Sequence, residues 1–321
     1  MQLNVAIIGL GYWGVKLLTH FNQHPFFSVT LACDRHQKNR QLALATFPNI
    51  STTDKDDDIF NNASIDVVVV ATQANYHYAL CKKALCHQKH VFVEKPFVLS
   101  TKEAAEICEL SERYQKKVFV NHIFLYTEGY KALKQIVTDN TLGKIYRISS
   151  QRCDFGKFPK DINIAWHLMY HDIYILTDLL NEDPQKVFFK GTGTVIKHLE
   201  DGACAIASYE SGIQASLFAD MYFPEKVRKV MIQCEQGIII WDEQQENPIT
   251  LTNHSARLDN QNTIIYHGDG SKKIITTPRF SALMNAIENF YNYLCSSIDV
   301  PCHAQAAMRI VKTVQDFSYV Q

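Results

Sequence analysis

The sequence lacks the features that would indicate a membrane-bound or nucleic-acid-binding protein. No apolar stretch reaches the length of about 18 residues that suggests a membrane-spanning helix. No charged leader with a cleavage site precedes the first apolar run. Lysine and arginine total 32 and aspartate and glutamate total 33, so the chain has no basic excess to attract nucleic acid or a membrane surface. We therefore expect a cytoplasmic protein with neither kind of partner.

The cysteines lack a pattern. The chain has nine, an odd number, and no two of them have C-x-x-C spacing. A disulfide framework or a zinc ribbon is therefore not indicated, and the cysteines fit free thiols in a reducing compartment.

Internal repeats and low-complexity linkers are absent as well. Because 321 residues exceed the usual size of one domain, we expect two domains.

Glycines interrupt the chain directly after its first apolar run, residues 5–8. Gly9, Gly11 and Gly14 have G-x-G-x-x-G spacing and precede a helical segment. The first glycine permits a tight turn, the second lets the backbone approach a pyrophosphate, and the third lets the helix pack closely on the sheet. The amino end of the helix also favours a phosphate. The pattern predicts a strand, a loop and a helix that bind a dinucleotide.

An acidic residue lies where such a site needs one. The next apolar run, residues 29–33, ends at Asp34, about 20 residues beyond the last glycine, where a carboxylate can accept hydrogen bonds from an adenosine ribose. Asp34 favours NAD, because a 2′-phosphate would lie against its charge. Arg35 leaves NADP possible, because an arginine can pair with that phosphate. A chance glycine turn with a surface aspartate is the alternative.

Two further apolar runs predict strands. Residues 66–72 suit a central parallel strand buried on both faces, and residues 90–93 make another strand. Ligands of such sheets bind beyond the carboxyl ends of the strands. After the first run, the plausible cofactor contacts are Thr72, Gln73 and Asn75. His77 would begin the next helix, and by itself it is more typical of a structural or capping histidine.

The second of these runs leads directly into Glu94-Lys95-Pro96. A proline at a strand end disfavours helix for the residue before it and fixes the local direction of the chain. Lys95 would thus be held at the carboxyl edge of the sheet, near the reactive end of the cofactor. Taken alone, the tripeptide is more typical of an ordinary surface Glu-Lys turn.

The two halves of the chain differ in their strand pattern. Up to about residue 120, apolar strands alternate with helical segments, as a doubly wound parallel sheet requires. From about residue 186 to 277, strands follow one another with glycine-containing turns, which predicts a mainly antiparallel sheet. Two final helices, near residues 281–296 and 303–317, are separated by Pro301.

Three histidine or tyrosine side chains share one face of a helix expected over residues 166–174. They are His167, His171 and Tyr174 at positions i, i+4 and i+7. The histidine spacing suits zinc ligands, but no third ligand is obvious. The alternatives are a structural helix with polar residues facing a cleft between the domains, and a catalytic helix.

Residues 54–58, with four aspartates, fit a solvated helix terminus better than a metal site.

These motifs together resemble one family of enzymes. The glycine pattern, Asp34, Ala71-Thr72 followed by His77, and Glu94-Lys95-Pro96 are similar to the glucose-fructose oxidoreductase and inositol dehydrogenase (Gfo/Idh/MocA) family. Gly11-Tyr12-Trp13-Gly14 and residues 121–126 (NHIFLY) resemble its branch acting on nucleotide-linked amino sugars and sugar acids. Further segments in family order are residues 142–146, 149–152, 161–166 and 224–228.

The resemblance implies a Rossmann-type nucleotide-binding domain over residues 1–121 and an α+β domain over residues 122–321. The second domain would carry a large open sheet through which homo-oligomers, dimers or tetramers, often pack. The expected activity is NAD(P)-dependent hydride transfer at a secondary alcohol of a sugar or nucleotide sugar. The implied cofactor contacts are Gly9, Gly11, Tyr12, Trp13, Gly14, Asp34, Arg35, Thr72, Gln73, Asn75, His77, Glu94 and Lys95.

The resemblance also assigns the chemistry. Oxidation of an alcohol needs a base for the hydroxyl proton and a donor for the developing oxygen charge. His171 matches the family's catalytic histidine, and Lys95 would hold the reacting oxygen. Weaker candidates for the substrate wall are Tyr126, Arg152, Asn163 and His167. Arg152 could pair with a carboxylate or pyrophosphate of the sugar, or it could be a solvated strand arginine.

One position departs from the family pattern. The family has aspartate four residues before its catalytic histidine, whereas this chain has His167, and Met169-Tyr170 replaces a Gly-Pro-type pair. A carboxylate would raise the basicity of the histidine, while a second imidazole supplies no negative charge. Two hypotheses therefore stay open, an active sugar dehydrogenase and an NAD-binding sensor or scaffold that has lost turnover.

Overall fold

The computed structural model describes residues 2–156, 158–296 and 300–319. The contacts divide the chain into two compact units. The first contains Met1–Tyr126 and Ser281–Lys312, and the second contains Thr127–Phe280 and Thr313–Gln321. The sequence predicts a single division, after residue 121, with everything beyond it in the second domain. The structure differs, because Ser281–Lys312 belongs to the first unit.

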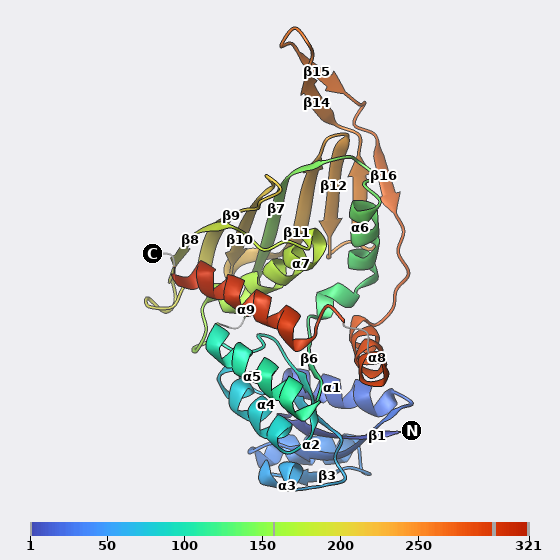
Figure 1. Cartoon of the computed structure of the whole chain (residues 1–321), viewed down its shortest axis with the longest axis vertical. Coiled ribbons are helices and arrows are strands. Elements are labelled where there is room, and N and C mark those ends of the chain that lie inside the picture. The colour runs from blue at the N-terminus through green and yellow to red at the C-terminus, as the bar shows by residue number, and fades with distance from the viewer. Residues whose placement is uncertain (1, 157, 297–299, 320–321) are drawn as a thin grey trace. The chain divides into compact units, whose positions relative to one another are not determined.

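The first unit is built on a six-stranded parallel sheet of order β3-β2-β1-β4-β5-β6 (Figure 1). Its strands are β1 (Leu3–Ile8), β2 (Phe27–Cys33), β3 (Ser51–Thr53), β4 (Val67–Val70), β5 (His90–Val93) and β6 (Val118–Val120). Every residue of β4 is buried, as expected for a central parallel strand covered on both faces. The doubly wound, Rossmann-type architecture expected from the alternating pattern is confirmed.

Helices follow the strands of this sheet. They are α1 (Tyr12–Gln23), α2 (Gln37–Thr46), α3 (Asp57–Phe60), α4 (His77–Cys86) and α5 (Thr101–Tyr114), with short 3₁₀ turns η1 (Ala74–Tyr76) and η2 (Ile123–Tyr126) and, from later in the chain, α8 (Ala282–Cys295). Ser100 caps α5 by accepting a hydrogen bond from the amide of Glu103.

Aromatic packing explains why the late segment joins the first unit. The Phe290 ring of α8 is fully buried, with its centroid 5.4 Å from that of Phe92 and 5.5 Å from that of Phe119. It also stacks on Phe27 of β2 at 5.8 Å. The Val120 amide donates to the Cys302 carbonyl at 2.8 Å, so the segment also pairs with the edge strand β6. Such long-range packing leaves no local trace in the sequence pattern.

The second unit contains an eight-stranded sheet of order β16-β13-β12-β11-β7-β10-β9-β8. Its strands are β7 (Ile145–Phe155), β8 (Lys186–Thr192), β9 (Gly202–Ser208), β10 (Gln214–Asp220), β11 (Tyr222–Cys234), β12 (Gly237–Asp242), β13 (Ile249–Thr252) and β16 (Lys272–Ile275). All neighbours are antiparallel except the parallel pair β7 and β10. The large, mainly antiparallel sheet is therefore confirmed.

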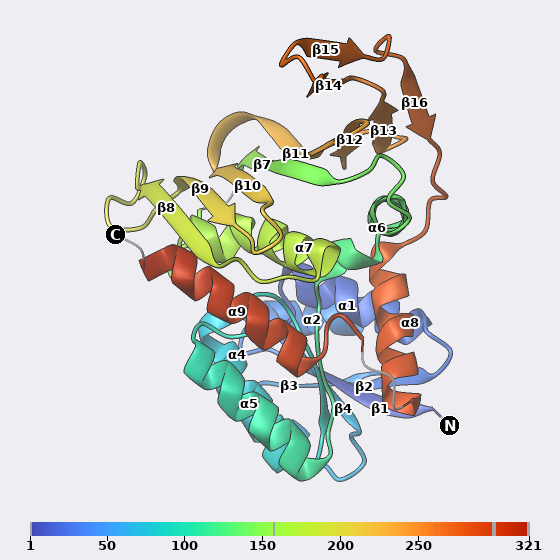
Figure 2. The same cartoon turned by 45° about the horizontal axis from the view of Figure 1, so that its top comes forward.

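Helices cover one face of this sheet (Figure 2). They are α6 (Glu128–Thr138), a π-helical turn η3 (Ala165–Met169) and α7 (Tyr170–Leu180). The last helix, α9 (Ala304–Tyr319), begins in the first unit and ends in the second. The strands β14 (Ser255–Leu258) and β15 (Ile264–His267) form a separate hairpin that extends past the strand ends (Figure 1). Across the described parts of the chain, the helices are too short or too polar to cross a membrane.

Candidate functional site

The three glycines of the first loop differ in what surrounds them. A Cβ atom at Gly9, where φ is +96°, would lie 2.6 Å from the Ala71 carbonyl oxygen. A Cβ at Gly14 would lie 1.8 Å from the Gly9 carbonyl oxygen, so the turn and the helix fit only without side chains. A Cβ at Gly11 would meet no protein atom within 4 Å. Open space at this glycine fits a ligand that approaches the backbone at the start of α1.

Asp34 lies beside this loop, directly after β2. Its Oδ2 accepts hydrogen bonds from the Leu10 amide at 2.8 Å and the Asn39 side chain at 3.1 Å, and its Oδ1 accepts from the His36 amide at 2.8 Å. Burial by itself would raise the Asp34 pKa, but these hydrogen bonds outweigh it and lower the pKa. A carboxylate offers about four acceptor positions, so about one remains for a ribose hydroxyl. The residues present therefore fit a dinucleotide.

Two arginines lie near Asp34. Arg35 lies over the Tyr76 ring, with its guanidinium carbon 5.9 Å from the ring centroid. Arg40, which the sequence analysis missed, donates from Nη1 to the Asp34 carbonyl at 2.7 Å. Its position six residues after Asp34, in the helix that follows, was the available signal. These guanidinium groups are the ones that a 2′-phosphate would need.

The loop after β4 places its expected contacts unequally. Gln73 and Asn75 are exposed and Thr72 is half-buried, while His77 is only 1% exposed. The His77 Nδ1 lies 2.8 Å from the Pro96 carbonyl oxygen, and Nε2 lies 3.1 Å from the Thr72 carbonyl oxygen. Burial lowers the pKa of His77, against the effect of these carbonyls. The buried His77 ring therefore bridges the loop after β4, which contains Thr72, and the segment after β5, which contains Pro96.

The segment Glu94-Lys95-Pro96 follows β5, and its Lys95–Pro96 peptide is cis. Glu94 is buried, and its Oε1 accepts a hydrogen bond from the Asn121 side chain at 2.8 Å. Burial raises the pKa of Glu94, and Asn121 and Lys95 oppose this effect. Burial and then the charge of Lys95 lower the pKa of the adjacent His122 to about 3. The charge of Lys95 therefore acts on two buried side chains, Glu94 and His122.

The second unit carries the histidine pair where η3 becomes α7. The expected helix is observed, but its first turn, which contains His167, is π-helical, a local geometry often found at functional sites. The His171 Nδ1 lies 3.1 Å from the Tyr174 hydroxyl, so these two side chains do share a face. The Asn163 Oδ1 accepts from the Trp166 amide at 3.3 Å, which places Asn163 at the amino end of this helix.

Arg152 occupies an unexpected environment in the middle of β7. Its side chain is 2% exposed, so it is neither a solvated strand arginine nor an open substrate contact. Its Nε and Nη2 donate to the two carboxylate oxygens of Asp172 at 3.0 and 3.1 Å, and Nη2 also donates to Glu243 at 3.1 Å. The charges of Asp172 and Glu243 outweigh burial and raise the Arg152 pKa. This cluster joins β7, α7 and the end of β12.

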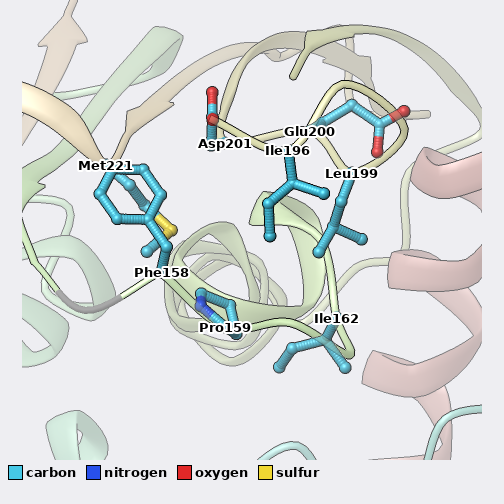
Figure 3. Close-up of a pocket in the computed structure, with 8 residues that line it drawn as sticks. All are labelled: Phe158, Pro159, Ile162, Ile196, Leu199, Glu200, Asp201 and Met221. Atoms are coloured by element: carbon cyan, nitrogen blue, oxygen red, sulfur yellow. The ribbon is translucent and has the colours of Figure 1, made fainter. Parts of the chain in front are cut away.

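The side chains of two further substrate candidates, Tyr126 and Asn163, make contacts within the protein itself. Tyr126, in the first unit, is 4% exposed and packs against Phe119. The Asn163 side chain donates to Glu200 at 3.1 Å. Near Asn163, a small pocket lies among apolar side chains with two carboxylates at its rim (Figure 3). The pocket is lined by Phe158, Pro159, Ile162, Ile196, Leu199, Glu200, Asp201 and Met221.

The two metal hypotheses can be compared with the geometry. Within residues 2–156, 158–296 and 300–319, no group of three histidine, cysteine, aspartate or glutamate side chains is arranged to hold a metal ion. In the acidic segment 54–58, the Lys83 ammonium lies 3.0 Å from Asp56 and 2.7 Å from Asp57. This ion pairing fits the interpretation as a solvated helix terminus.

Comparisons with known proteins place the chain in a family. The profile described as "Oxidoreductase family, NAD-binding Rossmann fold" matches residues 3–122, and the profile of the GFO/IDH/MocA C-terminal domain matches residues 130–240. The chain therefore belongs to the Gfo/Idh/MocA family of oxidoreductases, and its first unit carries the NAD-binding Rossmann fold. The resemblance inferred from the motifs is confirmed.

Relatives of known activity are similar at low identity. Inositol 2-dehydrogenase of Salmonella typhimurium is 25% identical over 74% of this chain and 69% of its own length. UDP-N-acetylglucosamine 3-dehydrogenase of Acidithiobacillus ferrooxidans is 24% identical over 97% of this chain and 95% of its own. A solved structure of the latter has a TM-score of 0.83 at 20% identity, covering 100% of this chain and 98% of that one. A structure of GenD2, from gentamicin A biosynthesis, with NAD has a TM-score of 0.84 at 16% identity, covering 99% and 94%.

Proposed function

We propose that the protein is an NAD(H)-dependent dehydrogenase that acts on a secondary alcohol of a sugar or nucleotide sugar. The observation that carries this proposal is the placement of Lys95 at the carboxyl edge of a sheet whose loop leaves Gly11 open. The activities named for the relatives, on inositol and on UDP-N-acetylglucosamine, support a polyhydroxylated substrate. The coverage of nearly the full chain by the second relative favours a nucleotide sugar.

Each residue has a defined role in this proposal. Lys95 donates a hydrogen bond to the reacting oxygen and stabilises its developing negative charge. His171 takes the hydroxyl proton on Nε2, because Nδ1 faces the Tyr174 hydroxyl at 3.1 Å, which orients the ring. Bound NAD would accept the hydride at its nicotinamide ring. Asp34 favours NAD over NADP through charge repulsion of a 2′-phosphate.

A second candidate function is supported by one substitution. His167 occupies the family's aspartate position, so the catalytic histidine lacks a carboxylate neighbour at that point. Without that charge, His171 is a weaker base. A protein that still binds NAD(H) but has lost turnover would serve as a sensor or scaffold.

One experiment separates the two functions. Absorbance of the reduced nicotinamide is followed while a panel of free sugars and nucleotide sugars is offered to the purified protein. We expect turnover in the unmodified protein, a loss of about 10²- to 10⁴-fold in Lys95→Met, and a comparable loss in His171→Ala. His167→Asp should keep or raise turnover, because it restores a negative neighbour. Tight NAD(H) binding without turnover, before and after His167→Asp, would support the sensor.

We also propose that copies of the chain associate through the outer face of the second unit's sheet, as dimers or tetramers. A cross-strand row on the face away from the buried side runs through all eight strands. Its members are Phe188, Ile206, Ser216, Ser149, Met231, Ile240, Thr250 and Ile274. Phe188, Ile206 and Ile274 are 60%, 49% and 61% exposed. Five of the eight side chains are apolar, and exposed apolar surface of this kind favours association.

A further inference from the structure

The strands β4 and β5 separate just before the proposed cofactor and catalytic residues. Their paired register ends at Val70 and Val93, and the Glu94 amide donates to the Val70 carbonyl at 2.9 Å. Beyond this point, the chains continue as the Thr72 loop and the Lys95-Pro96 turn. Proline has no amide hydrogen, so Pro96 can contribute only its carbonyl to a backbone hydrogen bond.

The His77 imidazole fills the space between the two separated chains. Its two nitrogens lie 2.8 Å from the Pro96 carbonyl oxygen and 3.1 Å from the Thr72 carbonyl oxygen. These partners are 19 and 5 residues away in the sequence. The side chain thus links the loops at the point where the strand pairing has ended.

Burial argues against a direct role of His77 in holding the cofactor. The residue is 1% exposed, whereas Gln73 and Asn75 in the same loop are exposed. A neutral imidazole has one N–H group, so it donates to one carbonyl at a time. The contact from Nδ1 to Pro96 is the shorter, and Pro96 is bonded directly to Lys95.

We propose that His77 is a positioning residue, which sets the location of Lys95 by donating its Nδ1 hydrogen to the Pro96 carbonyl. This inference rests on the proposed role of Lys95 as the donor to the reacting oxygen. Loss of the bond lets the Lys95-Pro96 turn shift relative to the β4 loop. A displacement of about 1 Å in a catalytic group can lower turnover about 10²-fold.

The test uses three substitutions that retain different donors. His77→Asn places an amide nitrogen near the position of Nδ1, His77→Gln places one near that of Nε2, and His77→Phe retains a ring without a donor. We expect kcat to fall about 10- to 100-fold in the Phe and Gln variants and to stay within about 3-fold of the unmodified protein in the Asn variant. NADH affinity, measured by fluorescence, should change less than about 3-fold in all three, because the ring does not hold the cofactor.

The control variant changes a different histidine, at the carboxyl end of α4. His87→Phe removes an exposed histidine at the other end of the same helix, and it should leave kcat, KM and NADH affinity unchanged. Unchanged kcat in His77→Phe would overturn the proposal, and so would a loss of NADH affinity parallel to the loss of kcat. If His77→Phe does not fold, the difference in kcat between the Asn and Gln variants decides.

A readout without substrate keeps this proposal separate from the proposed function. Amide hydrogen exchange of the segment around Lys95 in the ligand-free protein should be faster in the Phe and Gln variants and normal in the Asn variant. If the unmodified protein turns over no sugar, the proposed function fails while exchange still tests the link. Equal exchange in all variants would overturn the positioning role.

Discussion

The glycine loop of the first unit and the ion cluster of the second place their polar groups in opposite ways. In the loop, backbone amides supply the donors, since the Asp34 carboxylate accepts hydrogen bonds from the amides of Leu10 and His36. In the cluster, side chains supply both partners, because Arg152 donates to the carboxylates of Asp172 and Glu243. The backbone amides are placed by the loop and strand end that the residue spacing predicts, whereas the charged side chains meet only because β7, α7 and the end of β12 pack together.

The largest expected effect concerns two glycines of the loop, of which Gly14 is packed against protein backbone and Gly11 is open to the cofactor. Gly14→Ala should abolish NAD(H) binding and lower the melting temperature, because its Cβ would lie 1.8 Å from the Gly9 carbonyl oxygen. Gly11→Ala should leave the melting temperature unchanged, because its Cβ would meet no protein atom within 4 Å. It should still weaken NAD(H) binding about 10-fold or more through contact with the pyrophosphate. Unchanged binding in Gly11→Ala would show that the cofactor does not approach this residue.

In the second unit, the corresponding substitution is Arg152→Met. It leaves the buried carboxylates of Asp172 and Glu243 without this cation, which should cost about 3–5 kcal/mol of the free energy of unfolding. The measurement is urea denaturation at neutral pH. Arg279→Met is the matched control, because its ion pair with Glu246 is 73% and 75% exposed and should contribute almost nothing. Equal stability of the two variants would contradict the importance of the buried cluster.

A pH experiment tests a histidine of the first unit that is held by backbone. The Lys117 amide donates to the His90 Nδ1 at 2.9 Å, and burial with the charges of Lys116 and Lys117 lowers the His90 pKa to about 4. As the pH falls from about 6.5 to about 4, the unfolded chain takes up a proton that the folded chain does not. Folding should therefore lose about 2 kcal/mol between pH 7 and pH 5 through this residue.

The measurement compares the unmodified protein with His90→Gln, which keeps an acceptor for the Lys117 amide but cannot titrate. Urea denaturation at pH 7 and pH 5 should show a smaller loss of stability in the variant. The same loss in both proteins would mean that the low pKa of His90 does not govern acid sensitivity.

The smallest expected effect concerns cofactor choice. The unmodified protein should bind NAD(H) more tightly than NADP(H), and Asp34→Ala should narrow the difference about 10-fold by removing the charge that opposes a 2′-phosphate. Fluorescence titration with both reduced cofactors measures this. Stronger binding of NADP(H) by the unmodified protein would contradict the preference and would direct attention to Arg35 and Arg40.

Much of the first unit could be predicted from the sequence. The runs that precede Gly9, Asp34, Thr72 and Glu94 are all strands of one parallel sheet, so their carboxyl ends meet at one edge. The buried position of His77 could not be predicted, because its partner Pro96 lies 19 residues away, in the segment that follows the next strand of the chain. Asn121 begins the motif of residues 121–126, but its hydrogen bond to Glu94 forms only because β5 and β6 are adjacent in the sheet.

By itself, the sequence determined the doubly wound first sheet, the strand-rich second half, the glycine loop and the family, because periodicity and short spacings reflect local backbone geometry. Only the tertiary structure decided that α8 belongs to the first unit, where Phe290 completes an aromatic core. It also decided that Arg152 is buried with two carboxylates. The physical reason is the same in both cases, since burial and charge pairing depend on which distant residues meet, and a one-dimensional pattern carries no distance between them.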